Sequence, residues 1–280
     1  MDKPDFTEPR VYNKSDLTYQ DYLKVPELTG LQHLQSEHHD EMLFIIIHQT
    51  YELWFKQILH ELTAAMKTLD AGEVLRTRHY IARVVEILKL GISQIHLLET
   101  MAPVEFLQFR DILNPASGFQ SMQFREVEFM LGLKDERYLH FFKNRPDLCS
   151  ILQKRLQQRD FRTAFHEMIE KLGENVPKGS AEKEPTGDNA SRVALLGALQ
   201  GIYQKPEANL PLYLLCESLI ELDETLRLWR IHHVTVVERI IGFKKGTGGS
   251  SGVGYLRSTI DKQVFPLLWE VRTQLEKTED

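Results

Sequence analysis

Apolar residues recur every three to four positions along most of this chain, which is the spacing of one face of an α-helix. Long helices are predicted at 41–69, 73–101 and 210–243. No segment of useful length alternates between apolar and polar residues, as a half-buried strand would. We therefore expect an all-α protein. The pattern is clearest in the second helix, whose apolar stripe is Val74, Ile81, Val84, Val85, Leu88, Ile92 and Ile95.

Glycine, proline and small polar residues separate these helices. Pro103 is expected to open a short helix, where its missing N–H is harmless, and Asn114-Pro115 to end it, because the residue before proline is disfavoured in the α region. Asp40 is the expected N-cap of the first long helix. Further helices are predicted at 119–133, 135–144, 147–172, 191–205 and 255–277.

The 280 residues are 42 % hydrophobic, which is enough to bury a large core without disulfides or a structural metal. Residues 173–192 are charged and poor in large apolar side chains, so they are expected to form a surface insertion. Histidine-bearing helices lie on both sides of this insertion and look like parts of one site. We therefore expect a single helical domain over residues 1–280.

Charge and composition exclude several classes of protein. The net charge is −6 and no basic stripe carries interleaved aromatic residues, which argues against a nucleic-acid partner. The longest apolar run, Met42 to Ile47, is far shorter than the roughly 20 residues that cross a bilayer. The N-terminus has no apolar signal segment, and Cys149 and Cys216 have no nearby partner cysteine. These features predict a soluble cytoplasmic protein with no membrane partner and two free thiols.

The third long helix carries two adjacent histidines, His232 and His233. Neighbouring helical residues point about 100° apart, so the two rings cannot face one metal ion. A histidine on an apolar stripe is either a core residue with one hydrogen bond or a ligand facing a buried chamber. Residues on the face of His233 are Leu226, Trp229, Val237 and Ile240.

The chain then breaks into a glycine-rich segment at 246–254. A phosphate-binding loop is excluded, because the segment follows a helix and has no lysine after its glycines, and Ser251 occupies the third glycine position of a dinucleotide motif. A flexible linker and a mobile lid remain as interpretations. Its hydroxyl groups, which could bind a polar ligand, favour the lid. They belong to Thr247, Ser250 and Ser251.

Two further residues are candidates for chemistry. His48 ends an apolar run, with Phe44 one turn before it and Glu52 one turn after it. Burial there would lower the pKa of His48 and keep a neutral imidazole near pH 7, although a hydrogen-bonded core histidine is an alternative. Arg110, among aromatic and apolar residues, either pairs with an internal acid or remains available for a substrate carboxylate. No zinc-binding motif is present.

Four segments of this chain carry a specific resemblance, and they are LTYQDYL (17–23), HHDEMLFIIIHQTYELW (38–54), FRDILNPASGFQSMQFR (109–125) and LWRIHHVTVVERIIGFKKGTGGSSGVGYL (228–256). In this order they resemble the tryptophan 2,3-dioxygenase family, and together they span most of the chain outside 173–192. The resemblance implies an all-helical cytoplasmic enzyme with its haem pocket between long helices and a glycine-rich active-site loop. It also implies a homotetramer with haem b that inserts both atoms of O₂ across the indole C2–C3 bond of L-tryptophan. The product would be N-formyl-L-kynurenine, in the first step of the kynurenine route.

The same resemblance implies roles for particular residues. His233 stands at the position of the axial haem ligand, which suits a histidine on an apolar helical face. His48 stands at the position of the catalytic histidine that hydrogen-bonds the indole N–H. Ser117 is implied to lie near the haem. Residues implied to line the substrate pocket around His48 are Phe44, Ile45, Ile46 and Ile47.

At the polar end of the substrate, Arg110 is implied to hold the carboxylate and Thr247 to contact the amino-acid group. Phe106 lines the pocket where some bacterial members have tyrosine, so a hydroxyl contact to the carboxylate is lost. Tyr19 and Tyr22 lie in an N-terminal arm, residues 1–36, that reaches a neighbouring subunit's pocket in the family. Two alternatives remain: a haem enzyme of this family that oxidises another indole or transfers one oxygen atom, and a haem-binding helical protein without turnover.

Overall fold

The computed structural model describes residues 17–172, 189–247 and 251–276, which contain helices and no strands. This confirms the all-α prediction. The helices are α1 (Tyr19–Leu23), α2 (Val25–Thr29), α3 (His39–Asp70), α4 (Val74–Leu98), α5 (Pro103–Arg110), η1 (Asp111–Leu113), η2 (Gly118–Gln120), α6 (Met122–Leu131), η3 (Glu136–Phe142), α7 (Pro146–Gln157), α8 (Phe161–Leu172), α9 (Asn189–Gln204), α10 (Leu210–Ile241), α11 (Val253–Arg257), α12 (Pro266–Val271) and η4 (Arg272–Gln274).

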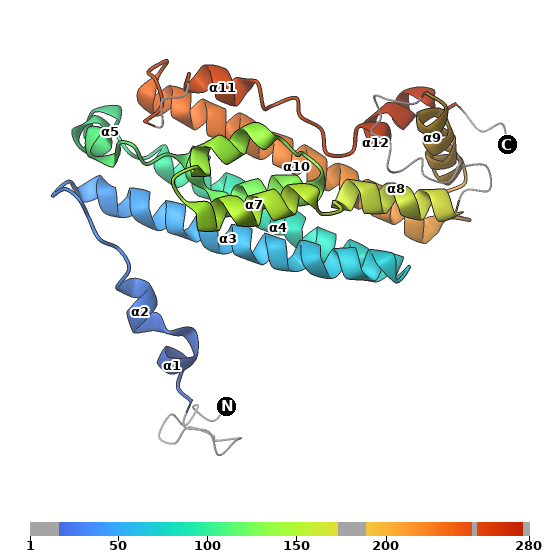
Figure 1. The fold of residues 1–280 in the computed structure, drawn as a ribbon, viewed down its shortest axis with the longest axis horizontal. Coiled ribbons are helices and arrows are strands. Elements are labelled where there is room, and N and C mark those ends of the chain that lie inside the picture. The colour runs from blue at the N-terminus through green and yellow to red at the C-terminus, as the bar shows by residue number, and fades with distance from the viewer. Residues whose placement is uncertain (1–16, 173–188, 248–250, 277–280) are drawn as a thin grey trace, which may run out of the picture.

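Three long helices form the body of the molecule, and they correspond to the three long helices predicted from the sequence. α4 packs against both α3 and α10 (Figure 1). Most of its predicted apolar stripe is buried: Ile81 and Val84 have no exposed surface, while Val74 and Ile92 are partly buried. Leu62 of α3 and Leu226 of α10 are equally buried. Removing such side chains from water is the main favourable term that holds the helices together.

Shorter helices cover this body. α6 packs against α3 and α7 against α6, while α8, α9 and α12 gather around one end of the long helices (Figure 1). Aromatic side chains fill that end, where Phe161 and Phe165 of α8 meet Phe265 edge-on. At the opposite end, α5 contacts α3 and α10. The aromatic core and the α5 end thus lie at opposite ends of the long helices.

The predicted helix at 147–172 is wrong in one respect, because the structure contains two helices, α7 and α8, in its place. Gln158 is extended, and the Asp160 carboxylate accepts a hydrogen bond from the Thr163 N–H at 2.8 Å. An aspartate in this position satisfies one of the unpaired amides at the start of a helix, so α8 begins anew there. The predicted helix at 135–144 is likewise present only as the 3₁₀ helix η3.

The predicted helix at 255–277 is also wrong. Only α11, α12 and the 3₁₀ turn η4 form there, and an irregular stretch separates α11 from α12. The amides of Val264 and Phe265 donate to the buried carboxylate of Asp223 on α10 at 2.9–3.0 Å instead of to a helical carbonyl. Pro266 then opens α12. The residue before a proline is disfavoured in the α region, so this local signal and the long-range acceptor together break the predicted helix.

The start of α3 differs from the prediction by two residues. His38 is the N-cap residue and makes no side-chain capping bond, and Asp40 lies within the first turn. The carboxylate of Asp40 therefore faces the positive end of the helix dipole but does not cap it. Glu41, next along the chain, is buried, and its contacts with the N-terminal arm are described below.

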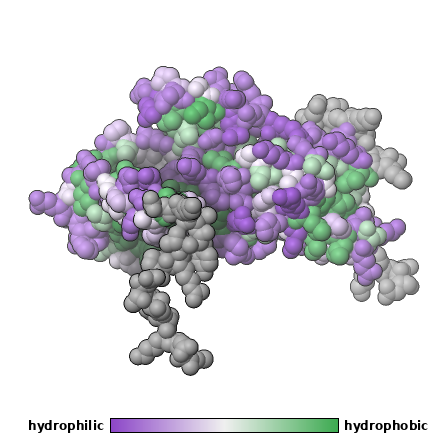
Figure 2. All heavy atoms as spheres, turned by 90° about the horizontal axis from the view of Figure 1, so that it is seen from below, coloured by the Kyte–Doolittle hydropathy of each residue, from purple (hydrophilic) through white to green (hydrophobic). Residues whose placement is uncertain are grey.

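Cys149 is half-buried and Cys216 buried, and both are free thiols as predicted. Within the described ranges, no helix is both long and apolar enough to cross a membrane. Hydrophilic side chains dominate the face in Figure 2, with smaller hydrophobic areas between them. Most of the predicted insertion, 173–188, lies outside the described residues, and α8 and α9, which flank it, pack against each other. The single-domain organisation stays a prediction.

Candidate active site

A cavity of about 560 Å³ lies between α3, α10, α6 and the segment around η2. This volume is in the range of small-molecule and cofactor sites, about 300–1,000 Å³, and the walls are mainly apolar and aromatic as in such sites. The structure therefore brings residues from distant parts of the sequence to one chamber. Six of the residues predicted from the sequence line it: Phe44, His48, Phe106, Ser117, His233 and Thr247.

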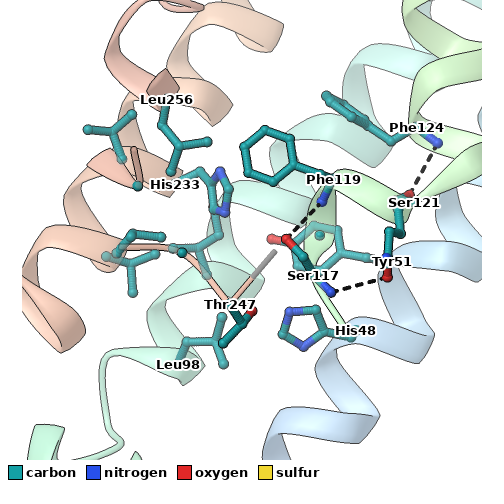
Figure 3. Close-up of a pocket in the computed structure, with 18 of the residues that line it drawn as sticks. His48, Tyr51, Leu98, Ser117, Phe119, Ser121, Phe124, His233, Thr247 and Leu256 are labelled. Carbon is teal, nitrogen blue, oxygen red and sulfur yellow. Dashed lines mark hydrogen bonds between the residues drawn. The ribbon is translucent and has the colours of Figure 1, made fainter. Parts of the chain in front are cut away.

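His48 from α3 and His233 from α10 project into this chamber from different sides (Figure 3). The Nδ1 of His48 lies 2.7 Å from the carbonyl oxygen of Phe44, one turn earlier. A carbonyl oxygen can only accept, so Nδ1 carries the hydrogen and, in the neutral ring, Nε2 keeps its lone pair. The helix backbone thus selects the tautomer in which Nε2 accepts a hydrogen bond.

His48 keeps open surface toward the cavity, but protein surrounds the ring on its other sides. This burial lowers the pKa of His48, while its bond to the Phe44 carbonyl and the charge of Glu52 act in the opposite direction. The ring also packs against Phe44, with centroids 4.1 Å apart. His48 is therefore a neutral, oriented acceptor near pH 7.

His233 lies flat against Trp229 one turn earlier on α10, with ring centroids 5.3 Å apart and planes 19° from parallel. Burial lowers the pKa of His233 to about 4, and the nearby His48 and Arg125 act in the same direction. Among the hydrogen bonds of the described residues, none involves the His233 ring. A neutral imidazole in an apolar wall without a protein partner is suited to coordinate a metal.

A cationic cluster lines another part of the chamber, and sequence reasoning missed it. Arg230 of α10 donates to Glu128 of α6 at 3.0 Å, and Arg125 donates to the other carboxylate oxygen of Glu128. All three side chains are at least 92 % buried. Two arginines against one glutamate leave one positive charge. The Nε of Arg125 is buried with no hydrogen-bond partner in the described part of the chain, so a donor remains available for an acidic group.

Glu52 was noted only as a neighbour of His48, yet it joins two walls of the chamber. Its carboxylate accepts from the Ser121 hydroxyl at 2.6 Å and from the Gln123 side chain at 2.9 Å. Ser121 is the N-cap of α6, so this contact fixes the start of that helix against α3. The preceding turn, η2, is closed by a capping box whose first residue is Ser117. The position of Ser117 in the chamber therefore depends on local capping and on Glu52.

Arg110 and Thr247 each donate a hydrogen bond to a backbone carbonyl group. Arg110 is not among the cavity-lining residues; its guanidinium donates to the carbonyl of Lys245, and it lies 3.9 Å from the exposed carboxylate of Asp111. The Thr247 hydroxyl donates to the carbonyl of Ala116 at 2.7 Å. No buried acid neutralises Arg110 within the described residues. Its guanidinium therefore keeps its positive charge for an anionic ligand.

The glycine-rich segment folds back on the end of α10. Gly252 has a φ of +65°, and a Cβ at this position would lie 2.5 Å from the carbonyl oxygen of Lys244. Only glycine accepts both this backbone conformation and this close approach. Of the three hydroxyl residues singled out in the segment, Ser250 lies outside the described residues and Ser251 is exposed. The lid stays a prediction.

The structure does not bring every predicted residue to the chamber. Ile45, Ile46 and Ile47 are absent from the cavity lining: Ile47 is in the hydrophobic core and Ile46 is 44 % exposed. The helical rotation that points Phe44 and His48 inward turns these residues elsewhere. Tyr19 and Tyr22, at 72 % and 71 % exposure, contribute nothing to the chamber of their own chain.

Comparison with known proteins shows the family of this chain. A family model described as tryptophan 2,3-dioxygenase matches residues 7–184 and 183–275. The tryptophan 2,3-dioxygenase of Herpetosiphon aurantiacus is 44 % identical over 261 residues, covering 92 % of this chain and 98 % of that protein. The enzymes of the same name from Myxococcus xanthus and Caulobacter vibrioides are each 41 % identical over 260 residues, covering 92 % and 93 % of this chain and 89 % and 99 % of the relatives. With matches along nearly its whole length, this chain belongs to the tryptophan 2,3-dioxygenase family.

Proposed function

We propose that this chain is a haem-dependent dioxygenase that inserts both atoms of O₂ across the indole C2–C3 bond of L-tryptophan, giving N-formyl-L-kynurenine. The observation that carries the proposal is the pair of neutral imidazoles, His48 and His233, that project into one apolar chamber. One imidazole would bind the metal and the other the substrate. Membership of the family supports this division of roles.

The residues of the chamber fit haem b. His233 would supply the axial ligand, since its ring is neutral and no hydrogen bond within the described residues occupies it. The unpaired Nε of Arg125 and the net positive charge of the cluster around it suit the carboxylate groups of the porphyrin. Apolar walls suit its macrocycle. When bound, the haem would supply the activated oxygen.

The remaining residues would bind and orient tryptophan. The Nε2 lone pair of His48 would accept the indole N–H, which fixes the rotation of the ring. Phe44 and Phe106, with ring centroids 5.5 Å apart, would form an aromatic wall beside it. The Arg110 guanidinium would hold the carboxylate in place of the Lys245 carbonyl that it now contacts. Holding both ends of the substrate places C2 and C3 for reaction, which is a proximity effect.

Two features bear on the polar end of the substrate. Phe106 has no hydroxyl, so Arg110 would be the main group for the carboxylate, with the Thr247 hydroxyl exchanging its bond to Ala116 for one to the amino-acid group.

We further propose a homotetramer in which the N-terminal arm of one subunit reaches the pocket of its neighbour. The exposure of Tyr19 and Tyr22 in a single chain supports this arrangement.

The experiment that tests the function is turnover of L-tryptophan under ¹⁸O₂ by the reduced, haem-loaded protein. A product carrying two labelled atoms is expected. One labelled atom would favour a monooxygenase, and no product would favour a haem-binding protein without turnover. In parallel, His233→Ala should abolish stable haem incorporation, and a normal haem spectrum with unchanged ligation in that variant would contradict the assignment of His233.

A further inference from the structure

The N-terminal arm does not leave the body of the protein freely. Its last part, residues 31–36, runs beside the first turns of α3 and is bonded to it at two points. At the first point, the side chain of Gln49 on α3 donates to the carbonyl of Leu31 at 3.1 Å. The side chain of Gln32 donates in turn to the Gln49 oxygen at 2.6 Å. These reciprocal bonds hold the arm alongside α3.

The second point of attachment is the carboxylate of Glu41, of which only 1 % is exposed. One of its oxygens accepts a hydrogen bond from the backbone N–H of Gln35 at 2.7 Å. The other accepts from the Ser36 amide at 2.8 Å and from the Ser36 hydroxyl at 2.5 Å. Hydrogen bonds to a charged acceptor are roughly twice as strong as neutral ones, and Glu41 also lies in the first turn of α3, where the helix dipole favours an anion. The carboxylate thus fixes the backbone where the arm turns into the helix.

Beyond this attachment the arm projects away from the body (Figure 1). None of the residues of α1 and α2 is buried. Apolar side chains concentrated on one exposed segment usually mark an interaction surface. A second copy of this chain is the partner that fits. In a two-fold symmetric dimer, the arm of each subunit can contact the other subunit in the same way. The exposed large apolar residues of the arm are Leu17, Tyr19, Tyr22, Leu23, Leu28, Leu31 and Leu34.

We propose that Glu41 is a positioning residue that acts on the neighbouring subunit. By fixing residues 35 and 36, it sets the direction in which the arm leaves α3, and so decides whether Tyr19 and Tyr22 reach the pocket of a second copy. The inference rests on the proposed function in one respect, that the pocket reached is the dioxygenase site. A buried carboxylate in one subunit thus controls the pocket of another subunit.

The first test measures the arm itself in the full-length, haem-loaded oligomer. Glu41→Gln keeps the shape of the side chain, but its amide nitrogen cannot accept, so at least one backbone amide loses its partner. Amide exchange at Gln35 and Ser36 should accelerate about tenfold or more. Glu61→Gln is the matched control: Glu61 is a buried carboxylate of the same helix, 2 % exposed, that pairs with Arg83 instead of the arm. Exchange at 35 and 36 should be unchanged in the control.

The second test assembles mixed oligomers from differently tagged subunits, Glu41→Gln and His233→Ala. The Glu41→Gln homo-oligomer should have at most about a tenth of the wild-type activity, in line with the expected loss of a charged hydrogen bond. The His233→Ala homo-oligomer should have none. In a mixed pair, the intact arm of the His233→Ala subunit serves the intact pocket of the Glu41→Gln subunit. Activity should therefore return to about half of the wild-type value, since one of two reciprocal pockets is complete.

Several results would overturn the proposal. They are wild-type activity of the Glu41→Gln homo-oligomer, unchanged exchange at 35 and 36, or a mixed oligomer no more active than the mean of its parents. Gln49→Leu, which detaches the arm without touching a buried charge, should show the same rescue and replaces Glu41→Gln if that variant does not fold. If the wild-type protein forms no N-formylkynurenine, the proposed function fails, while amide exchange and oligomer mass still decide the role of Glu41.

Discussion

The cationic cluster of Arg125, Glu128 and Arg230 gives a prediction about the stability of the protein. Glu128→Gln keeps the size of the side chain but removes the carboxylate that, among the described residues, pairs with both Arg125 and Arg230. Both arginines stay buried: Arg230 also donates to the carbonyl of Lys262 at 2.9 Å, and the Arg125 guanidinium lies 4.0 Å from the centre of the Tyr138 ring. Neither can move into water without breaking these contacts. The variant therefore holds two positive charges that no carboxylate of the described residues balances.

Breaking a buried ion pair by removing one partner costs about 3–5 kcal/mol of unfolding free energy. That is a large share of the roughly 5–15 kcal/mol by which a folded protein is stable. The melting temperature should fall by about 6–20 °C, at about 2–4 °C per kcal/mol for a chain somewhat shorter than this one. An amide in place of the carboxylate keeps one acceptor, so the lower half of these ranges is expected for Glu128→Gln.

The assay is urea unfolding followed by circular dichroism, with all variants at the same haem content. Glu238→Gln is the control, because Glu238 pairs with the half-exposed Arg257 and should change stability by no more than about 1 kcal/mol. A double variant, Glu128→Gln with Arg230→Met, should lose at least about 0.5 kcal/mol less than the sum of the single losses. A loss below about 1 kcal/mol for Glu128→Gln would refute the charge-balance argument. A double variant whose loss equals the sum of the two single losses would refute it as well.

Three other predictions concern separate parts of the chain. Arg110→Ala should weaken tryptophan binding about 10- to 100-fold while leaving indoles without a carboxylate nearly unaffected in equilibrium titrations, and equal losses would contradict its role. Burial lowers the pKa of His166 from 6.5 to about 4, so the unfolded chain binds the proton more readily and stability is lost as the pH falls through this window. Between about pH 7.5 and about pH 5 the wild type should lose about 2 kcal/mol more than His166→Gln in urea titrations, and parallel pH profiles would exclude His166 as the cause. Asp223→Ala leaves buried N–H donors without an acceptor and should lower the unfolding free energy by about 3 kcal/mol or more in thermal unfolding. Asp261→Ala, at an exposed ion pair, should lower it little, and similar losses in the two variants would contradict the structural role of Asp223.

Local periodicity was enough to predict the long helices, because the 3.6-residue repeat of apolar side chains is a property of each segment by itself. The predicted spans at 41–69 and 210–243 differ from α3 and α10 by at most two residues at either end. The same repeat placed Phe44, His48 and Glu52 on one helical face, and all three line the chamber. It also argued against Ile46, which lies on the side of the helix opposite that face, but the resemblance carried Ile45, Ile46 and Ile47 into the predicted pocket as a block.

Tertiary structure alone decided which distant residues the buried polar side chains contact. Glu128 and Arg230 are separated by 102 positions, and nothing in either local sequence indicates that they form a buried pair. Asp223 likewise takes hydrogen bonds from residues 264 and 265, a long-range contact that adds to the local helix-breaking effect of Pro266. Helix propensity differs by less than about 1 kcal/mol between ordinary residues, whereas a buried carboxylate left without its donors costs more than that. A long-range polar contact therefore outweighs local preference wherever the packed core excludes water.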